Sequence, residues 1–193
     1  MKGLKNVNPK NFIVFIVLIG VIFSLYFYLN GNKQVDNMKG RTEAEKLLLK
    51  DLDGDYPATP TGVVKLYNRI SKCLYNDQWN NDEVNGLIDM MRELFSVELL
   101  ENNPAEKYNT SFKADIADYH EKRKTIMTYK VDGSNQVKIQ EENGTEYATL
   151  NSVYSVAENK DHYKIYQRFI LKKEGNQWKI LGWKSIPDAE VVE

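Results

Sequence analysis

The sequence reads YQRFILKKEGNQWKILGW from Tyr166 to Trp183, and its pattern gives the clearest indication of the fold. Apolar and polar residues alternate on both sides of the Gly175-Asn176 pair, which is typical of a turn. Such alternation predicts two antiparallel β-strands with one buried face and one solvated face. In the strand before the turn, the expected buried face carries Tyr163, Ile165, Phe169 and Leu171, and the expected wet face carries Lys164, Arg168 and Lys172.

The period-two pattern extends upstream as far as Thr125. Asp132-Gly133 and Asn143-Gly144 each predict a hairpin turn in this part of the chain. Asn-Gly is the stronger signal, because a two-residue hairpin turn needs positive φ at both positions. Strands joined at such short intervals predict an antiparallel meander in which each strand pairs with the next. The expected strands cover residues 125–131, 136–142, 145–157, 162–173 and 177–186.

Before residue 125 the apolar residues recur with a period of 3.6, which predicts four helices. The first two are expected to begin near residues 42 and 61. Asn81 or Asp82 should cap the third, and Asn103 should cap the fourth through a capping box with Glu106. Helices followed by strands predict an α+β domain over residues 42–186, with the helices packed on one face of a curved antiparallel sheet.

Residues 12–29, FIVFIVLIGVIFSLYFYL, contain no charged side chain. A helix rises about 1.5 Å per residue, so this run nearly spans a hydrocarbon core and predicts a transmembrane helix at residues 12–30. Lys2, Lys5 and Lys10 precede it without any acid, which predicts a cytoplasmic tail at residues 1–11. We therefore expect a single-pass protein of the cell membrane with a spacer at 31–41, an extracytoplasmic domain at 42–186 and a C-terminal tail at 187–193.

The composition excludes several classes of protein. The chain has 193 residues and a formal net charge of −1, which argues against a basic nucleic-acid binder. Its single cysteine, Cys73, cannot form an intramolecular disulfide, and one Cys with two His leaves too few ligands for a structural zinc site. We expect Cys73 to be a buried apolar residue, and we expect no metal and no cofactor.

The closing hairpin, in which a basic strand and a glycine turn lead into Trp178-Lys179-Ile180, resembles the last hairpin of the nuclear-transport-factor-2-like (SnoaL-like) superfamily. The helix sequence VVKLYNRISKCLYN from Val63, and the order of helices before sheet, are similar to single-span bacterial proteins of that superfamily. The resemblance implies a cone-shaped domain whose inner sheet face lines a cavity. It also implies a role in the bacterial cell envelope, since similar anchored domains occur in secretion-channel assembly factors and as non-catalytic modules of cell-wall enzymes.

Residues 51–55, DLDGD, place acids at alternate positions, as a calcium-binding loop does. The register does not fit, because such a loop needs Gly and Glu where this chain has Tyr56 and Gly62. We predict a turn that ends a helix instead.

Asp115, Asp118 and His120 crowd the end of the fourth helix, and members of the superfamily with proton-transfer chemistry use an Asp and a His in their pocket. Ile116 and Tyr119 mark the buried stripe of this helix, so the acids and His120 are expected to face solvent. No nucleophile motif or phosphate-binding glycine loop occurs. We therefore predict no catalytic residue, no Asp or His inside the cavity, and no enzymatic activity.

Gln167 is the single amide in the apolar stripe of the fourth strand, and a buried amide needs hydrogen-bond partners. It is either paired with a neighbouring backbone group or Tyr hydroxyl, or it anchors a ligand in the cavity together with Tyr129 and Trp183.

Two functions follow from these features. The leading hypothesis is a non-catalytic, membrane-anchored interaction or assembly module of the cell envelope, which binds a protein partner through an exposed apolar patch near Tyr166 and Ile170. The alternative is a sensor domain that binds a small molecule in the cavity. An open cavity with Gln167 and an inward carboxylate would favour the sensor, and a cavity filled by aromatic side chains would favour the interaction module. The resemblance also permits a homodimer through the sheet.

Overall fold

The computed structural model of the chain describes residues 40–188, and from Glu43 on these residues belong to one compact unit. The unit is α+β, as predicted, with helices that precede an open antiparallel sheet. The helices are α2 (Glu43–Leu48), α3 (Pro60–Asn76), α4 (Asn81–Arg92), α5 (Val97–Asn102) and α6 (Ala105–Glu121). The strands are β1 (Lys124–Val131), β2 (Lys138–Glu142), β3 (Thr145–Glu158), β4 (Asp161–Glu174) and β5 (Gln177–Ile186), with a short 3-10 helix, η1 (Ser134–Gln136), before β2.

Between residues 40 and 188, none of the helices combines the length and the apolar character that crossing a membrane requires. The predicted transmembrane helix at residues 12–30 and the tail at 1–11 lie outside the described residues, as does most of the predicted spacer.

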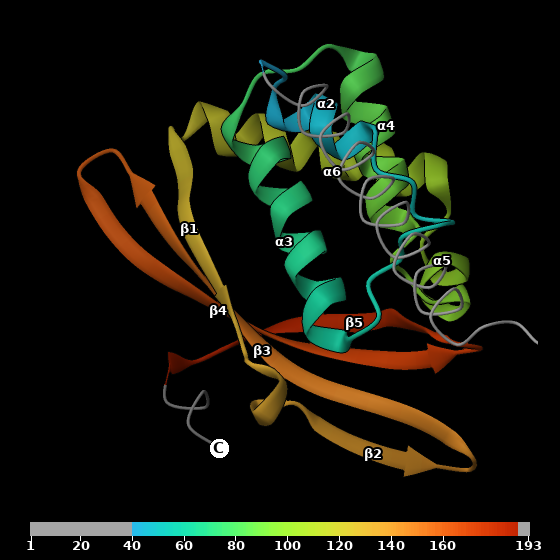
Figure 1. Cartoon of the computed structure of the whole chain (residues 1–193). Coiled ribbons are helices and arrows are strands. Elements are labelled where there is room, and N and C mark those ends of the chain that lie inside the picture. The colour runs from blue at the N-terminus through green and yellow to red at the C-terminus, as the bar shows by residue number, and fades with distance from the viewer. Residues whose placement is uncertain (1–39, 189–193) are drawn as a thin grey trace, which may run out of the picture. The chain divides into compact units, whose positions relative to one another are not determined.

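The sheet is not the simple meander that the sequence predicts. Its strand order is β1-β3-β4-β5, and β2 also pairs with β3. β1 pairs with the C-terminal half of β3 and β2 with its N-terminal half, so the two short strands follow one another along the same side of β3 (Figure 1). The predicted hairpin at Asp132-Gly133 is therefore wrong: the chain there passes through η1 and continues along β3 rather than folding back on β1. The physical reason is length, because β3 has 14 residues and β1 only 8.

The other turns form as predicted. Asn143 and Gly144 have φ of 51° and 76°, the left-handed pair that joins β2 to β3. Gly175, at φ 58°, joins β4 to β5. Asn159, at φ 55°, lies in the turn between β3 and β4, which pair residue by residue from Glu158 and Asp161 onward. The register of β4 and β5 shifts once, between Ile170 and Leu171.

The helix ends differ from prediction at two caps. Asn80, one residue earlier than expected, caps α4 by accepting hydrogen bonds from two backbone N–H groups, and Glu83 completes its capping box. The capping box predicted at Asn103 is absent, because the Asn103 amide donates instead to the Leu99 carbonyl at 2.9 Å. Helix α5 was not predicted; Ser96 caps it by accepting from the Leu99 N–H at 3.1 Å.

All five helices lie on one side of the sheet (Figure 1). We call the sheet face that the helices cover the inner face and the opposite one the outer face. Phe169 and Leu171 of β4 are completely buried on the inner face, against the equally buried Ile70 and Leu74 of α3. The segment between α4 and α5 also protects the edge of β5, where the Ile180 N–H donates to the Leu94 carbonyl at 2.7 Å. The predicted division of β4 into a buried and a wet face is confirmed.

Candidate functional site

A cavity of about 450 Å³ lies between the inner face and helices α3 and α6. Its volume is within the range of small-molecule sites in proteins. Seven aromatic side chains line it. They are Tyr67 and Tyr75 of α3, Tyr108, Phe112 and Tyr119 of α6, Tyr154 of β3 and Trp183 of β5. The cavity is open, so these rings form its wall without filling it.

The helix periods explain why the aromatic rings meet. Tyr67, Ser71 and Tyr75 follow each other at intervals of four on α3, and Phe112 and Tyr119 lie on the facing side of α6. The Tyr75 ring packs against Phe112 at 5.6 Å and against Tyr119 at 4.7 Å between centroids. These contacts hold α6 to α3 at the rim.

Two buried polar atoms in the cavity wall lack hydrogen-bond partners. The Gln167 Oε1 and Tyr119 hydroxyl oxygens are both inaccessible to solvent, and within residues 40–188 neither takes part in a hydrogen bond. Leaving such an atom unpaired costs about 1–3 kcal/mol. Both residues line the cavity, and their two buried oxygens keep an unused capacity for hydrogen bonds.

A satisfied polar network lies directly beside this wall. The buried Asn68 side chain donates to Ser152 Oγ at 2.6 Å and accepts a hydrogen bond from the Tyr154 hydroxyl. Ser152 is the neighbour of Gln167 across β3 and β4, and Ser185 is its neighbour on β5, so three polar side chains cross the inner face in one row. Only Gln167 among them has a buried atom without a partner.

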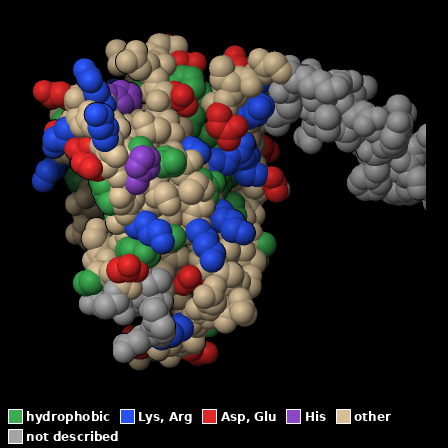
Figure 2. All heavy atoms as spheres, turned by 90° about the vertical axis from the view of Figure 1, so that its left-hand side faces the viewer, with side chains coloured by type: hydrophobic (Ala, Val, Ile, Leu, Met, Phe, Trp, Pro, Cys, Tyr) green, Lys and Arg blue, Asp and Glu red, His purple; other side chains and the backbone are tan. Residues whose placement is uncertain are grey.

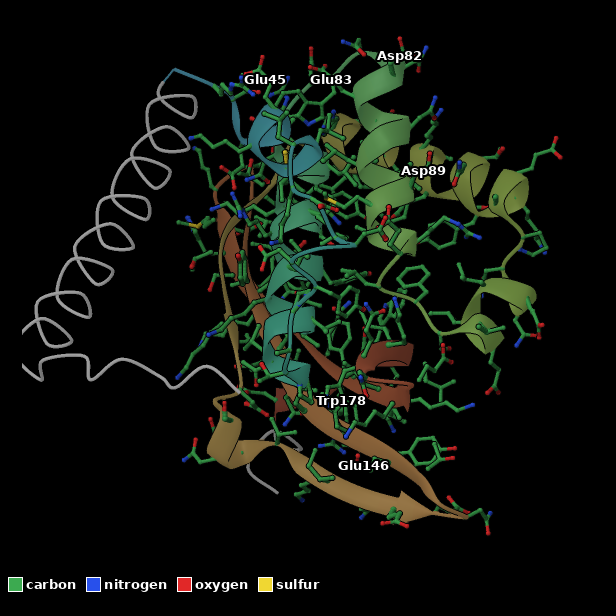
Figure 3. All side chains as sticks on the ribbon, turned by 45° about the vertical axis from the view of Figure 1, so that its right-hand side comes forward. Glu45, Asp82, Glu83, Asp89, Glu146 and Trp178 are labelled. Atoms are coloured by element: carbon green, nitrogen blue, oxygen red, sulfur yellow. The ribbon has the colours of Figure 1, made fainter. Side chains whose placement is uncertain are left out.

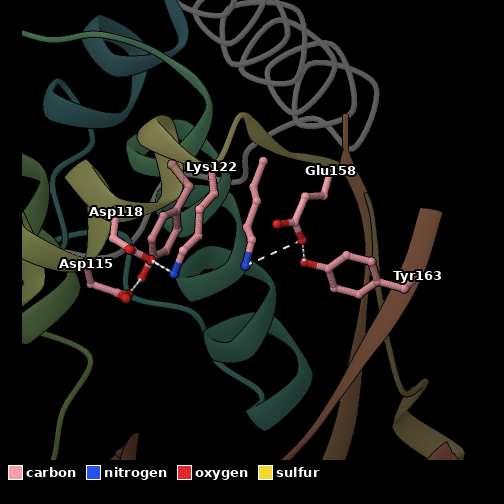
Figure 4. Close-up of polar contacts among 7 residues, drawn as sticks. Asp115, Asp118, Lys122, Glu158 and Tyr163 are labelled. Carbon is pink, nitrogen blue, oxygen red and sulfur yellow. Dashed lines mark hydrogen bonds and ion pairs between the residues drawn. The ribbon is translucent and has the colours of Figure 1, made fainter. Parts of the chain in front are cut away.

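Charged side chains surround the rim of the cavity (Figure 4). The Tyr75 hydroxyl donates to Asp115, and Lys122 Nζ lies 2.7 Å from Asp118 Oδ2. Across the opening, Lys124 Nζ lies 3.6 Å from Glu158 Oε2, which also accepts from Tyr163 at 2.9 Å. Asp115, Asp118 and Lys124 line the cavity itself, so carboxylates outnumber ammonium groups there.

The tyrosine hydroxyls in the wall are neutral hydrogen-bonding groups at physiological pH. Burial raises the pKa of Tyr119 to about 12. Burial and the bonded Asp115 carboxylate together raise the pKa of Tyr75 still further. Neither group can serve as a base near neutral pH, whereas both can donate and accept hydrogen bonds.

The structure brings together two of the three residues that the sequence proposes for a ligand pocket. Gln167 and Trp183 line the cavity, and Trp183 packs against Tyr67 at 5.2 Å. Tyr129 is not part of the lining, because it lies behind Tyr154, with ring centroids 6.4 Å apart.

The expectation that no Asp or His lies in the cavity is wrong for the aspartates. Asp115 and Asp118 are exposed, as predicted, but they line the rim because the aromatic stripe of α6 turns toward the cavity on the same side. His120 is also not simply solvated: its Nε2 lies 2.8 Å from the Tyr75 carbonyl oxygen. His120 is outside this cavity.

The remaining candidates have structural roles. Asp51 Oδ1 accepts from the Asp53 and Gly54 N–H groups, which confirms a turn at the end of a helix. Cys73 is buried, and burial raises the pKa of its thiol to about 12, so it is a poor nucleophile. His162 is exposed, as predicted. Among residues 40–188 there is no group of three or more His, Cys, Asp or Glu that could hold a metal ion.

Comparison with known proteins gives a family and one structural likeness. The model of a family described as a domain of unknown function (DUF6715) matches residues 1–183. No curated protein matches the chain. The solved intermembrane-space region of the chloroplast protein ARC6 is similar over 69% of this chain and 98% of that one, with 13% sequence identity and a TM-score of 0.36. A likeness at that TM-score carries no argument about the fold or the function.

Proposed function

The chain belongs to the DUF6715 family, and we propose that its α+β domain binds a small aromatic molecule in the cavity between α3, α6 and the sheet. The observation that carries the proposal is the pair of unpartnered polar atoms, Gln167 Oε1 and Tyr119 Oη, in an otherwise aromatic wall. An aromatic ligand with a hydroxyl or N–H group would pack against the rings and donate to Gln167. The ligand would then remove the cost of the unpaired Gln167 oxygen.

Binding without catalysis agrees best with the side chains in the wall. The tyrosines are held neutral, the carboxylates of Asp115 and Asp118 are paired with the Tyr75 hydroxyl and with Lys122, and His120, outside the cavity, lies beside a backbone carbonyl. No general base is therefore poised on the interior of the cavity.

We further propose that residues 12–30 anchor this domain in a cell membrane, with residues 1–11 cytoplasmic and the domain at 42–186 extracytoplasmic. The uncharged run of apolar residues and the lysines before it support this topology. The family match begins at residue 1, so the apolar run is part of the unit that the family shares. Helices that cover one face of a sheet around a cavity also support a nuclear-transport-factor-2-like, cone-shaped domain.

An interaction or assembly module of the cell envelope is the second candidate, and the two functions can coexist in one sensor. Ile170 on the outer face, 43% exposed, is the observation that favours a protein partner or a second copy of the chain there. The surrounding cations make this apolar patch small, so the cavity is the stronger candidate site.

Tyramine tests the proposal, since its phenol can donate to Gln167 and its ammonium group can face Asp115 and Asp118. Isothermal titration calorimetry on the full chain in detergent should show saturable binding of one tyramine per chain. Ser185→Trp should abolish it, because Ser185 is exposed yet lines the cavity, and an indole there fills the opening without disturbing the core.

Lys184→Trp is the matched control, since Lys184 is the exposed neighbour of Ser185 on the opposite face of β5. It should bind tyramine like the unmodified chain, and circular dichroism should show both variants folded. Absence of saturable binding in the unmodified chain, or equal binding in the two variants, would overturn the proposal.

A further inference from the structure

The outer face of the sheet is basic. Since Phe169 and Leu171 face inward, the alternate residues of β4 face outward, and strand pairing places further cations beside them. Lys184 of β5 lies directly opposite Arg168, for example. The cations of this basic face are Lys130, Lys138, Lys164, Arg168, Lys172 and Lys184.

The central strand of this face contributes no opposing charge. The outward residues of β3 that pair between these cations are uncharged, from Tyr147 and Thr149 to Ser155 and Ala157. Figure 2, which views the side where β1 and the β3–β4 hairpin lie, shows a row of Lys and Arg side chains across the middle of the molecule. Among the described residues, the basic face therefore presents positive charges on both sides of a strand whose outward side chains include no acid.

The chain as a whole is nearly neutral, so the basic face implies a separation of charge. The formal net charge is −1, and acids collect on the helical side instead. Asp82, Glu83 and Asp89 project from α4, away from the sheet (Figure 3). A polyanion would accordingly be attracted to the outer face and repelled from the helical side.

A polar cleft of about 530 Å³ adjoins the basic face, between η1, β2, β3 and β4. Four side-chain amides line it, those of Asn135, Gln136, Gln140 and Asn151. The charged groups in its lining are Lys138, Arg168 and Asp132, and Arg168 Nε donates to Asn151 Oδ1 at 3.1 Å. None of its described lining residues is aromatic. Amides both donate and accept hydrogen bonds, as the hydroxyl groups of a sugar require, and the two cations suit an acidic group on that sugar.

The loop that forms the cleft is held in place before any ligand arrives. The Asp132 N–H donates to the Asn151 carbonyl at 3.0 Å, and the Asn151 N–H donates to Asp132 Oδ2 at 2.8 Å. Thr61 of α3 donates to the Asp132 carbonyl at 3.1 Å, and Gln136 Oε1 accepts from the Gly133 N–H at 3.1 Å. A ligand therefore meets a preformed site, which lowers the entropy cost of binding.

We propose that the outer face binds an acidic polysaccharide, with one sugar unit in the polar cleft and the acidic groups of the following units along the basic face. A single acidic sugar would use only the cleft, whereas the cations continue along β4 and β5, so a polymer fits better. Nucleic acid fits the cleft less well because its described lining contains no aromatic ring on which a base can stack, although Tyr147 lies on the same face of the sheet. The inference concerns the face opposite the cavity and is independent of the small-molecule site.

Polygalacturonate is the probe that tests this inference, with galactan as the neutral polysaccharide and polyglutamate as the polyanion without sugar. On the full chain in detergent, we expect polygalacturonate to bind most tightly, with an affinity that falls as salt is added. The triple variant Lys164→Ala/Arg168→Ala/Lys184→Ala should weaken its binding about tenfold, since each exposed ion pair contributes modestly.

Lys65→Ala/Lys107→Ala/Lys113→Ala is the matched control, because it removes the same charge from helices α3 and α6. It should leave polygalacturonate binding unchanged. Asn135→Ala/Gln140→Ala removes two exposed amides from the cleft and should weaken polygalacturonate binding while leaving polyglutamate binding as it was. Three outcomes would each overturn the proposal. The two triple variants could lose polygalacturonate binding equally, or no saturable binding could be observed. Polyglutamate, or single-stranded RNA as a further probe, could bind as tightly as polygalacturonate.

Discussion

The inner and outer faces of the sheet are built from the same strands and yet differ in chemistry. Gln167 and Arg168 are neighbours in β4, but the first has a buried oxygen in an aromatic cavity and the second lies in a polar cleft among cations. Because successive side chains of a strand point to opposite faces, each face can change without altering the other. The stability of this domain therefore depends on the inner face, while the outer face can carry charge.

The largest test of this division compares two residues of β4. Phe169 is completely buried and packs against Tyr67 and Trp183, with ring centroids at 5.4 Å and 6.0 Å. Phe169→Ala should lower the free energy of unfolding by about 3–5 kcal/mol, the cost of a large cavity in a packed core. Lys164→Ala, on the exposed outer face, should change it by no more than about 0.5 kcal/mol. Urea unfolding of the full chain measures both, and similar losses would show that the outer face also supports the fold.

The buried tyrosines predict a second difference, in the response to alkaline pH. Burial raises the pKa of Tyr108 to about 12, although the Arg92 guanidinium, 5.1 Å from its ring centre, acts in the opposite direction. In the unfolded chain the same hydroxyl titrates near its usual value of 10.0. Between these two values the folded state therefore keeps a proton that the unfolded state releases. The contribution of Tyr108 to the free energy of unfolding is fully present below pH 10 and falls as the pH rises toward 12.

Tyr108 alone contributes at most about 3 kcal/mol to this loss, at 1.36 kcal/mol for each unit of pKa. Tyr108→Phe should make the decline above pH 10 shallower, because the substituted ring has no proton to release. Urea unfolding at a series of pH values, with tyrosinate absorbance to follow ionisation, checks the slope. An unchanged slope in Tyr108→Phe would show that this hydroxyl ionises in the folded state.

Much of the fold could be predicted because apolar and polar residues alternate regularly along the strands. The Asn143-Gly144 turn identifies the β2–β3 hairpin, and the apolar stripe of β4 with the turn at Gly175 identifies the β4–β5 hairpin, from local sequence alone. Local sequence does not predict that β1 and β2 both pair with the long strand β3. That pairing depends on strand length and on the contact of the Asp132 loop with α3, which local sequence does not show. Helix α5 was missed because it is only 6 residues long and has no apolar period to detect.

The cavity could be predicted only in part. Gln167 was found because an amide interrupts an apolar stripe, and the same signal exists on α6, where Asp115 interrupts the stripe of Tyr108, Phe112 and Tyr119. The sequence favours a solvated acid there, since Ile116 marks a buried side of the same helix, and Asp115 is indeed exposed at the rim. Tyr129 was included wrongly, because which inward residues reach the cavity depends on how Tyr154 packs in front of it.

The smallest test concerns the polar row that crosses the inner face. Ser152 is 2% exposed and accepts a hydrogen bond from Asn68 Nδ2 at 2.6 Å, whereas Ser155 lies on the outer face of the same strand. Ser152→Ala leaves a completely buried amide donor without its partner, which should cost about 1–3 kcal/mol. Ser155→Ala should cost no more than about 0.5 kcal/mol, because water replaces any bond of an accessible hydroxyl. If the two substitutions cost the same in urea unfolding, water must reach Asn68 through the cavity, and the inner face would be less sealed than its side chains indicate.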